Sequence, residues 1–226
     1  MKHSILSLLL FFTGGWVLGQ SDTAKLMTEA ESKLASHSSS ISAILSNPVY
    51  DMLHPKTAFR ELVKKYADTK PLVITHDNEP GKKIKVTATV KNKDGQPVAG
   101  ALVYLYQTDT RGWYAADAPH VLEYEGDMRH ARLFGYVKTD KNGKIELHTV
   151  KPSGYPRSDL PAHIHVHVIA EGYESYGTEF LFDDDERLAG TIREQAVRNQ
   201  FIIAKPGSAK APFLQEFSYS ILLYKK

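Results

Sequence analysis

The chain has 226 residues, of which 42% are hydrophobic and 24% are charged, and its formal net charge is +2. This length is enough to bury one sizeable core. Because charges of both signs are mixed along the sequence, nucleic acid and anionic surfaces are not expected as partners. The sequence has no cysteine and therefore no disulfide, so an exported form would depend on its core and on a bound metal for stability.

Residues 1–19 have the pattern of a secretory signal peptide. The basic residue Lys2 is followed by an apolar run over residues 5–12, and residues of small or moderate size precede Gln20. A membrane anchor is the alternative, but residues 5–18 are interrupted by a Thr-Gly-Gly sequence and fall short of the roughly 20 residues a spanning helix needs. We therefore expect cleavage, a periplasmic or extracellular location, and no membrane association of the mature chain.

Residues 20–70 are predicted to form a helical extension. Leu26, Ala30 and Leu34 recur at near-helical spacing, which predicts a helix over residues 21–47 that ends at an Asn-Pro pair. A second helix is expected over residues 56–66. We expect these helices to pack on the main domain, while a lid or a dimer contact is the functional alternative. The sequence leaves the oligomeric state open, and a homo-oligomer is one of the states it allows.

From residue 71 onward the period of the pattern changes from helical to two, which is typical of strands. Asn142-Gly143 marks a hairpin turn, because both residues tolerate positive φ. Many short strands separated by turns, without intervening helices, predict an all-β fold for residues 71–226, an antiparallel β-sandwich. The expected strands cover residues 83–91, 97–106, 132–139, 144–149, 163–170, 177–182, 200–204 and 217–223.

The residues that indicate chemistry are two histidines and two tyrosines. Side chains alternate between the faces of a strand, so His163 and His165 project from the same side. Tyr155 lies in the Pro/Gly-rich loop just before that strand, and Tyr114 lies in an earlier loop. His167 shares the face of the other histidines, so a three-histidine zinc or copper site is an alternative. It is placed about 6.6 Å beyond His165, and we interpret it as a supporting residue.

Five motifs in order resemble the intradiol ring-cleavage dioxygenases, which include the catechol 1,2- and protocatechuate 3,4-dioxygenases. They begin at Pro97, Gly112, Thr139, Lys151 and Pro161, and read PVAGALVYLYQ, GWY, TDKNG, KPSGYP and PAHIH. The resemblance covers roughly residues 74–224, the whole predicted sandwich.

The resemblance implies a mononuclear non-haem Fe(III) held by Tyr114, Tyr155, His163 and His165. Phenolates are hard anionic donors that suit the ferric state, and imidazole is a good iron ligand. It further implies that a small catechol-type substrate and O2 react at this iron, so that the ring opens between its two hydroxylated carbons to a muconate-type diacid. In this interpretation Tyr155 is the ligand that the substrate displaces, and it then acts as a base.

Two positions depart from the family's pattern. Leu160 stands where these enzymes commonly have an arginine, and Glu179 stands where they usually have a glutamine. Arg157 is therefore our candidate for the catalytic cation, ahead of Arg111 and Arg132. The alternatives are a non-catalytic, Ig-like β-sandwich binding or accessory module, which would explain the two departures better, and a divergent metal-binding homologue with little turnover. The pocket is expected to include Trp113, Tyr136, Arg157 and Tyr176, and the identity of the catechol is not readable from the sequence.

Overall fold

The computed structural model describes residues 14–115 and 131–226, and it describes side chains from residue 22 onward. The helices are α1 (Gly14–Ala35), α2 (Ile41–Leu45), η1 (Pro48–Leu53), α3 (Thr57–Lys65) and α4 (Gly190–Arg198). The strands are β1 (Leu72–Val73), β2 (Lys83–Asn92), β3 (Leu102–Gln107), β4 (Leu133–Lys138), β5 (Lys144–Val150), β6 (His163–Ile169), β7 (Tyr176–Phe182), β8 (Ile202–Ala204) and β9 (Gln215–Leu223).

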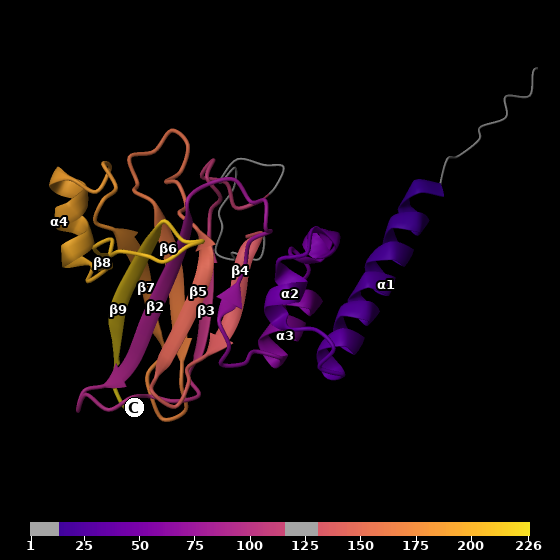
Figure 1. Ribbon diagram of the computed structural model, residues 1–226, viewed down its shortest axis with the longest axis horizontal. Coiled ribbons are helices and arrows are strands. Elements are labelled where there is room, and N and C mark those ends of the chain that lie inside the picture. The colour runs from indigo at the N-terminus through magenta and orange to yellow at the C-terminus, as the bar shows by residue number, and fades with distance from the viewer. Residues whose placement is uncertain (1–13, 116–130) are drawn as a thin grey trace, which may run out of the picture.

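The strands form two sheets that pack face to face (Figure 1). One sheet has the order β1-β5-β2-β9 and the other has the order β4-β3-β6-β7-β8. The prediction of a β-sandwich with N-terminal helices is confirmed. Most strand pairs are antiparallel, but β1 with β5, β2 with β9 and β7 with β8 are parallel. In β6, Ile164, Val166 and Val168 point into the core, which leaves its three histidines on the opposite face.

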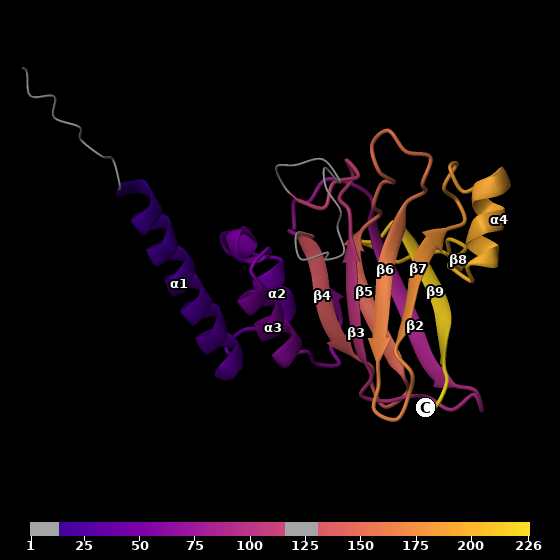
Figure 2. The same ribbon diagram turned by 180° about the vertical axis from the view of Figure 1, so that it is seen from behind.

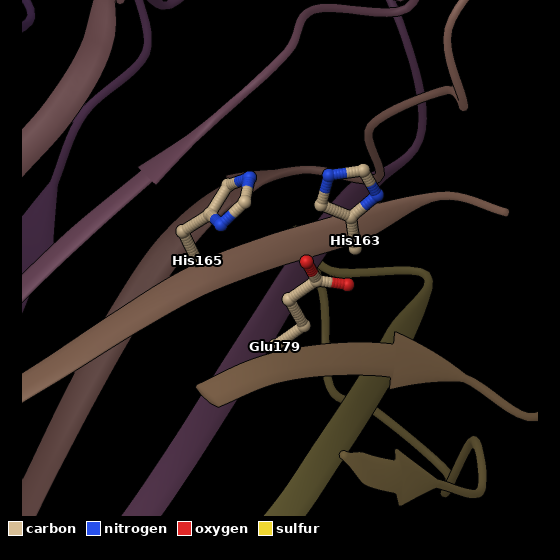
Figure 3. Close-up of side chains that lie close together, drawn as sticks. All are labelled: His163, His165 and Glu179. Atoms are coloured by element: carbon tan, nitrogen blue, oxygen red, sulfur yellow. The ribbon is translucent and has the colours of Figure 1, made fainter. Parts of the chain in front are cut away.

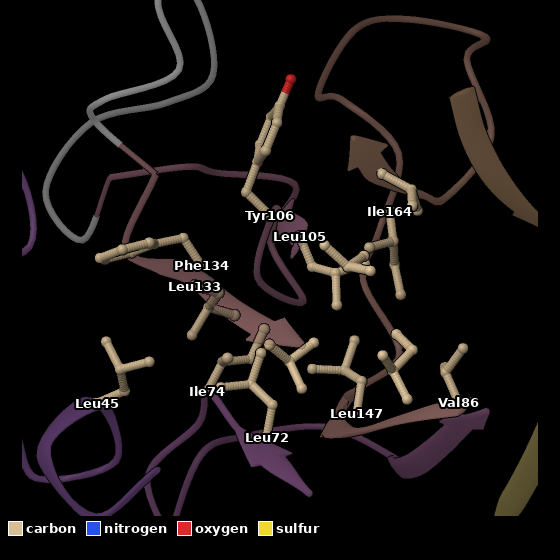
Figure 4. Packing of buried hydrophobic residues seen from close by; sticks show 14 of the residues in the cluster. Leu45, Leu72, Ile74, Val86, Leu105, Tyr106, Leu133, Phe134, Leu147 and Ile164 are labelled. Carbon is tan, nitrogen blue, oxygen red and sulfur yellow. The ribbon is translucent and has the colours of Figure 1, made fainter. Parts of the chain in front are cut away.

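The core lies between the sheets and continues into the helical arm. Figure 4 shows Val86 and Leu147 of one sheet near Leu105 and Ile164 of the other, with Leu45 of α2 at one side. The N-terminal helices, α1 to α3, and both sheets thus share one cluster of buried side chains. Figure 2 shows α2 and α3 next to β4, with α1 outside them and α4 at the far edge by β8.

The helix predicted over residues 21–47 is in fact two helices, α1 and α2. The break lies in the Ser-His-Ser-Ser-Ser run, where Ser36 donates a hydrogen bond from its hydroxyl to the Ser32 carbonyl and His37 adopts a φ of 55°. Serine hydroxyls that bond to nearby backbone compete with helix continuation. The Ser40 side chain then caps α2 by accepting from the Ala43 amide.

The expectation that helices would be absent between the strands was wrong at one place. The amphipathic segment α4 lies between β7 and β8, where Ala196 packs with Leu181 and Leu188 in a small separate cluster. A parallel β7–β8 pair needs a crossover connection, and α4 provides it.

The predicted signal peptide lies mostly outside the described residues, and its cleavage remains a prediction. Across residues 14–115 and 131–226, none of the helices combines the length and the apolar character needed to cross a membrane.

Candidate metal centre

The first strand histidine is oriented by its own backbone. His163 is buried, and its Nδ1 lies 2.8 Å from the Pro161 carbonyl oxygen. Because a carbonyl can only accept, Nδ1 carries the proton, and the lone pair of Nε2 faces the site. That Nε2 lies 2.9 Å from the Tyr155 hydroxyl. A histidine whose other nitrogen donates to a carbonyl is fixed in the tautomer that binds a metal.

The second strand histidine is oriented by an aromatic neighbour. The His165 ring stacks on Tyr106 of β3, with centroids 4.4 Å apart and planes within 8° of parallel. Its Nε2 lies 2.8 Å from the hydroxyl of Tyr114. The two tyrosine hydroxyls are themselves 2.8 Å apart. The four predicted ligands therefore form one continuous series, in the order His163, Tyr155, Tyr114, His165.

Tyr114 is almost fully buried and is held by the turn before it. The Asp109 carboxylate accepts hydrogen bonds from the backbone amides of Arg111 and Trp113. Gly112 adopts a φ of +78°, a conformation that favours glycine. On the other side, the Tyr114 carbonyl accepts a hydrogen bond of 2.8 Å from the Arg132 amide at the start of β4.

The loop that carries Tyr155 is tied to the loop that carries Tyr114 through Ser153. Thr108 donates its hydroxyl proton to the Ser153 carbonyl, the Ser153 amide donates to Asp109, and the Ser153 hydroxyl donates to Thr110. These bonds are 2.7, 3.1 and 2.8 Å long. This role of Ser153 cannot be predicted from the sequence, because a serine in a Pro/Gly-rich loop carries no local sign that its hydrogen bonds join two loops.

The other end of the tyrosine loop is held by the segment after β7. Asp185 accepts a hydrogen bond of 2.7 Å from the Ala162 amide, next to His163. Arg187 reaches the backbone carbonyls of Tyr155 and Leu160, each at 3.4 Å. The roles of Asp185 and Arg187 cannot be predicted from the sequence either, since a run of charged residues after a strand is typical of a solvated turn.

Glu179 lies beside the two histidines. It is the register partner of His165 across β6 and β7, and one donor atom each of His163, His165 and Glu179 lie within 4.8 Å of one another (Figure 3). Burial raises the pKa of the Glu179 carboxyl, while neighbouring His163 acts in the opposite direction. The Glu179 carboxylate is therefore a further group able to interact with a cation here.

The structure does not bring every predicted residue to the centre. Arg157 is exposed at a turn, with a φ of 61°. Arg111 pairs with Asp109, and Arg132 forms two hydrogen bonds to Glu79. His167 stays outside the cluster of donors that could hold a metal within the described residues.

The other residues expected to line the pocket, Trp113, Tyr136 and Tyr176, have neighbours outside the group of four donors. Trp113 stacks under the Arg111 guanidinium, and Tyr136 stacks on Tyr104. Tyr176 pairs with Val168 at the other end of β6 from His163. His148 bonds to Glu146 in the other sheet. Two further histidines, His120 and His130, lie outside the described residues.

The residues present fit a single metal ion. Donors at adjacent corners of a site with bonds of about 2.1 Å lie about 3 Å apart, close to the spacing of the neighbouring donors here. Two phenolates and two neutral imidazoles suit a hard, highly charged cation such as Fe(III), and would leave it with a net charge of about +1. Zinc and copper sites built on three histidines are disfavoured, because His167 does not join the cluster.

Comparison with known proteins identifies the family. The family model described as "Dioxygenase" matches residues 58–225, most of the chain. The chain belongs to the intradiol ring-cleaving dioxygenases. It is 27% identical over 128 residues to chlorocatechol 1,2-dioxygenase of Rhodococcus opacus, covering 49% of this chain and 48% of that protein. It is 30% identical over 125 residues to the protocatechuate 3,4-dioxygenase beta chain of Burkholderia cepacia, covering 50% of each.

Solved structures of catechol dioxygenases share the fold of this chain. Catechol 1,2-dioxygenase from Pseudomonas arvilla C-1 superposes with a TM-score of 0.56 at 21% identity, over 70% of this chain and 57% of that one. The chain spans about half the length of the curated relatives it matches. The matched family region begins inside α3, so α1 and α2 lie outside it.

Proposed function

We propose that this chain is an Fe(III)-dependent intradiol dioxygenase that opens a catechol-type ring between its two hydroxylated carbons, with O2 as co-substrate. The observation that carries the proposal is the convergence of Tyr114, Tyr155, His163 and His165, with neighbouring donor atoms 2.8 to 2.9 Å apart. A bound ferric ion would act as a Lewis acid that polarises the coordinated catecholate and makes its ring reactive toward O2.

The two tyrosines differ in their access to a substrate. Tyr114 is only 2% exposed, whereas Tyr155 is half-buried and lines a cavity. Tyr155 is therefore the group that an incoming catechol meets first. As a phenolate, its oxygen is placed to accept a proton from a substrate hydroxyl. Tyr114 would stay in place and hold the geometry.

The location of this activity is also part of the proposal. The pattern of residues 1–19 supports export, so the substrate would be met outside the cytoplasm.

Loading the purified protein with ferric iron tests the function. We expect a visible tyrosinate-to-iron absorption band that shifts when catechol is added without O2, followed by ring opening when O2 is admitted. Tyr114→Phe and Tyr155→Phe should weaken or shift the band. Tyr224→Phe is the matched control, because Tyr224 is 55% exposed and is not one of the four donors. This substitution should leave the band unchanged. A protein that stays colourless with ferric salt would instead support a non-catalytic module.

A further inference from the structure

Arg132, immediately before β4, is held in place at three points. Its amide donates the 2.8 Å hydrogen bond to the Tyr114 carbonyl, and its own carbonyl oxygen lies 2.7 Å from Nδ1 of His54. Its guanidinium donates two hydrogen bonds, of 2.8 and 2.6 Å, to the Glu79 carboxylate. The main chain of Arg132 therefore contacts a predicted metal ligand, while its side chain is held by a residue from another segment.

The Glu79–Arg132 pair is almost completely buried. The Glu79 side chain is 5% exposed and the Arg132 side chain is 11% exposed. Glu79 lies in the connection between β1 and β2, which belong to one sheet, and Arg132 leads into β4 of the other sheet. The pair thus joins segments that enter opposite sheets of the sandwich.

Glu79 also connects this pair to the helical arm. Its Oε2 lies 3.9 Å from Nδ1 of His76, and Nε2 of His76 lies 2.9 Å from the Asp51 carboxylate in η1. The Glu79 amide donates a hydrogen bond of 3.1 Å to the His76 carbonyl, within the same turn. Glu79 is therefore held from the side of the arm as well as from the side of β4.

Stability alone does not account for a buried ion pair. Taking two charges out of water is costly, and well-packed apolar side chains of similar volume are often at least as stable. What a two-point pair adds is a fixed geometry, because the planar guanidinium meets both carboxylate oxygens at once. That geometry reaches Tyr114 directly, since the Arg132 side chain and the amide that holds Tyr114 belong to the same residue.

We propose that Glu79 and Arg132 are positioning residues for Tyr114, because their buried pair fixes the place of the Arg132 amide and thereby the place of the Tyr114 hydroxyl among the four donors. The inference rests on the proposed function in one respect, since it takes Tyr114 as a metal ligand. Arg132 acts through its main chain, and its guanidinium charge is taken up by Glu79 and does not serve as the catalytic cation.

The first test needs no metal. Protein made with fluorotyrosine gives a fluorine NMR signal for each tyrosine ring, and Tyr114→Phe identifies the signal of residue 114. We expect Glu79→Gln to move this signal, because a neutral amide offers the guanidinium only one acceptor oxygen. Glu216→Gln is the matched control. Glu216 pairs with Lys85 at 2.9 Å between β9 and β2, so losing that charge should leave the Tyr114 signal in place.

A second variant separates position from stability. Glu79→Leu combined with Arg132→Met replaces the ion pair by apolar side chains, and such replacements of buried pairs are often neutral or stabilising. We expect this double variant to unfold in urea much as wild type does, while its Tyr114 signal moves as in Glu79→Gln. It also carries the test if Glu79→Gln does not fold. A double variant that keeps the Tyr114 signal in place would show that packing alone is enough.

Binding of iron tests the same pair in the loaded protein. In a Tyr155→Phe background the tyrosinate-to-iron band arises from Tyr114, and in a Tyr114→Phe background it arises from Tyr155. We expect Glu79→Gln to shift the band in the first background and not in the second. With both tyrosines present, Glu79→Gln should weaken Fe(III) binding about tenfold, whereas Glu216→Gln should leave it unchanged.

A Tyr114 signal that stays in place in Glu79→Gln, or that moves equally in Glu216→Gln, would overturn the inference. The same band shift in both tyrosine backgrounds would also overturn it, because the effect would then not pass through Tyr114. The fluorine signal is read without metal. A protein that stays colourless with ferric salt therefore defeats the proposed function, while the place of Tyr114 is still measured.

Discussion

A short chain of hydrogen bonds positions the first histidine of the candidate centre. His163 is fixed by the Pro161 carbonyl, and the residue between them, Ala162, donates its amide proton to Asp185. Asp185 in turn accepts from the Arg187 amide at 2.9 Å. The start of β6 is thus held by a short segment that follows about 20 residues later in the chain. The position of His163 depends on that segment.

Asp185→Ala is expected to weaken metal binding about tenfold or more, because groups that orient a ligand contribute strongly to metal affinity. The buried Ala162 amide would also lose its acceptor, at a cost of about 1–3 kcal/mol in the free energy of unfolding. Titration of the metal-free protein with Fe(III) or Zn(II) measures the first effect. Asp185→Asn should restore most of the affinity, since its amide oxygen can still accept, and Glu186→Ala should change nothing. Equal losses for all three variants would contradict a positioning role.

His54 is a buried histidine outside the candidate centre. It is 2% exposed, stacks on Phe59, and places Nδ1 2.7 Å from the Arg132 carbonyl oxygen. Burial lowers the pKa of His54 from 6.5 to about 4, against the opposing effect of the bond to Arg132. The folded protein therefore keeps this ring neutral where the unfolded chain would already bind a proton.

Stability should consequently fall as the pH falls from about 6.5 to about 4, since the unfolded state binds more protons over that window. A difference of this size corresponds to about 3 kcal/mol in the free energy of unfolding. Urea unfolding of metal-free protein at several pH values measures it. His54→Phe should flatten the dependence although it lowers stability overall. His37→Asn, at an exposed position of positive φ, should leave the slope intact. Parallel curves for wild type and His54→Phe would refute the assignment.

The two tyrosine loops act as one unit because they touch through backbone as well as side chains. A Cβ on Gly112 would overlap the Gly154 carbonyl oxygen and lie 3.0 Å from Pro156. The loops can approach this closely only where a side chain is missing. Their approach, together with the Ser153 hydrogen bonds, determines the distance between the Tyr114 and Tyr155 hydroxyls.

Gly112→Ala is therefore expected to separate the two tyrosines, to weaken metal binding by an order of magnitude or more, and to reduce stability by more than about 1 kcal/mol. Gly100→Ala provides a matched control. Gly100 has a similar φ of +74°, but a Cβ there would meet nothing within 4 Å. Its substitution should cost stability from backbone strain and leave metal affinity unchanged. The same loss of metal affinity in both variants would show that contact between the loops is not the cause.

For the whole molecule, the helical arm and the sandwich behave as parts of one hydrophobic core. Phe59 of α3 is fully buried against Phe134 of β4, and the Arg60 guanidinium lies 3.7 Å from the centroid of the Phe134 ring. Arg60 also bonds to the carbonyls of His54 and Ala131 and to the Tyr104 hydroxyl. The arm thereby supports the start of β4, whose Arg132 amide in turn bonds to Tyr114.

Phe59→Ala should accordingly destabilise the entire domain by about 3–5 kcal/mol in a single cooperative transition, because it creates a cavity in a shared core. Glu61→Ala on the exposed side of the same helix should change stability by less than about 0.5 kcal/mol. Unfolding followed by tryptophan fluorescence and by circular dichroism should give coincident transitions. A variant in which α3 is lost while the sandwich melts as in wild type would show that the arm is independent.

The sequence by itself determined the β-sandwich and the same-face placement of His163 and His165, while Tyr114 and Tyr155 were singled out as metal ligands by the resemblance to a known family. Strand alternation and turn residues are local properties, so they can be read without coordinates. It did not reveal α4, the break between α1 and α2, or the supporting roles of Ser153, Asp185 and Arg187. Only the tertiary structure decided how close the two tyrosine loops come and which carboxylate lies beside the two histidines, because those contacts join residues from different segments of the chain.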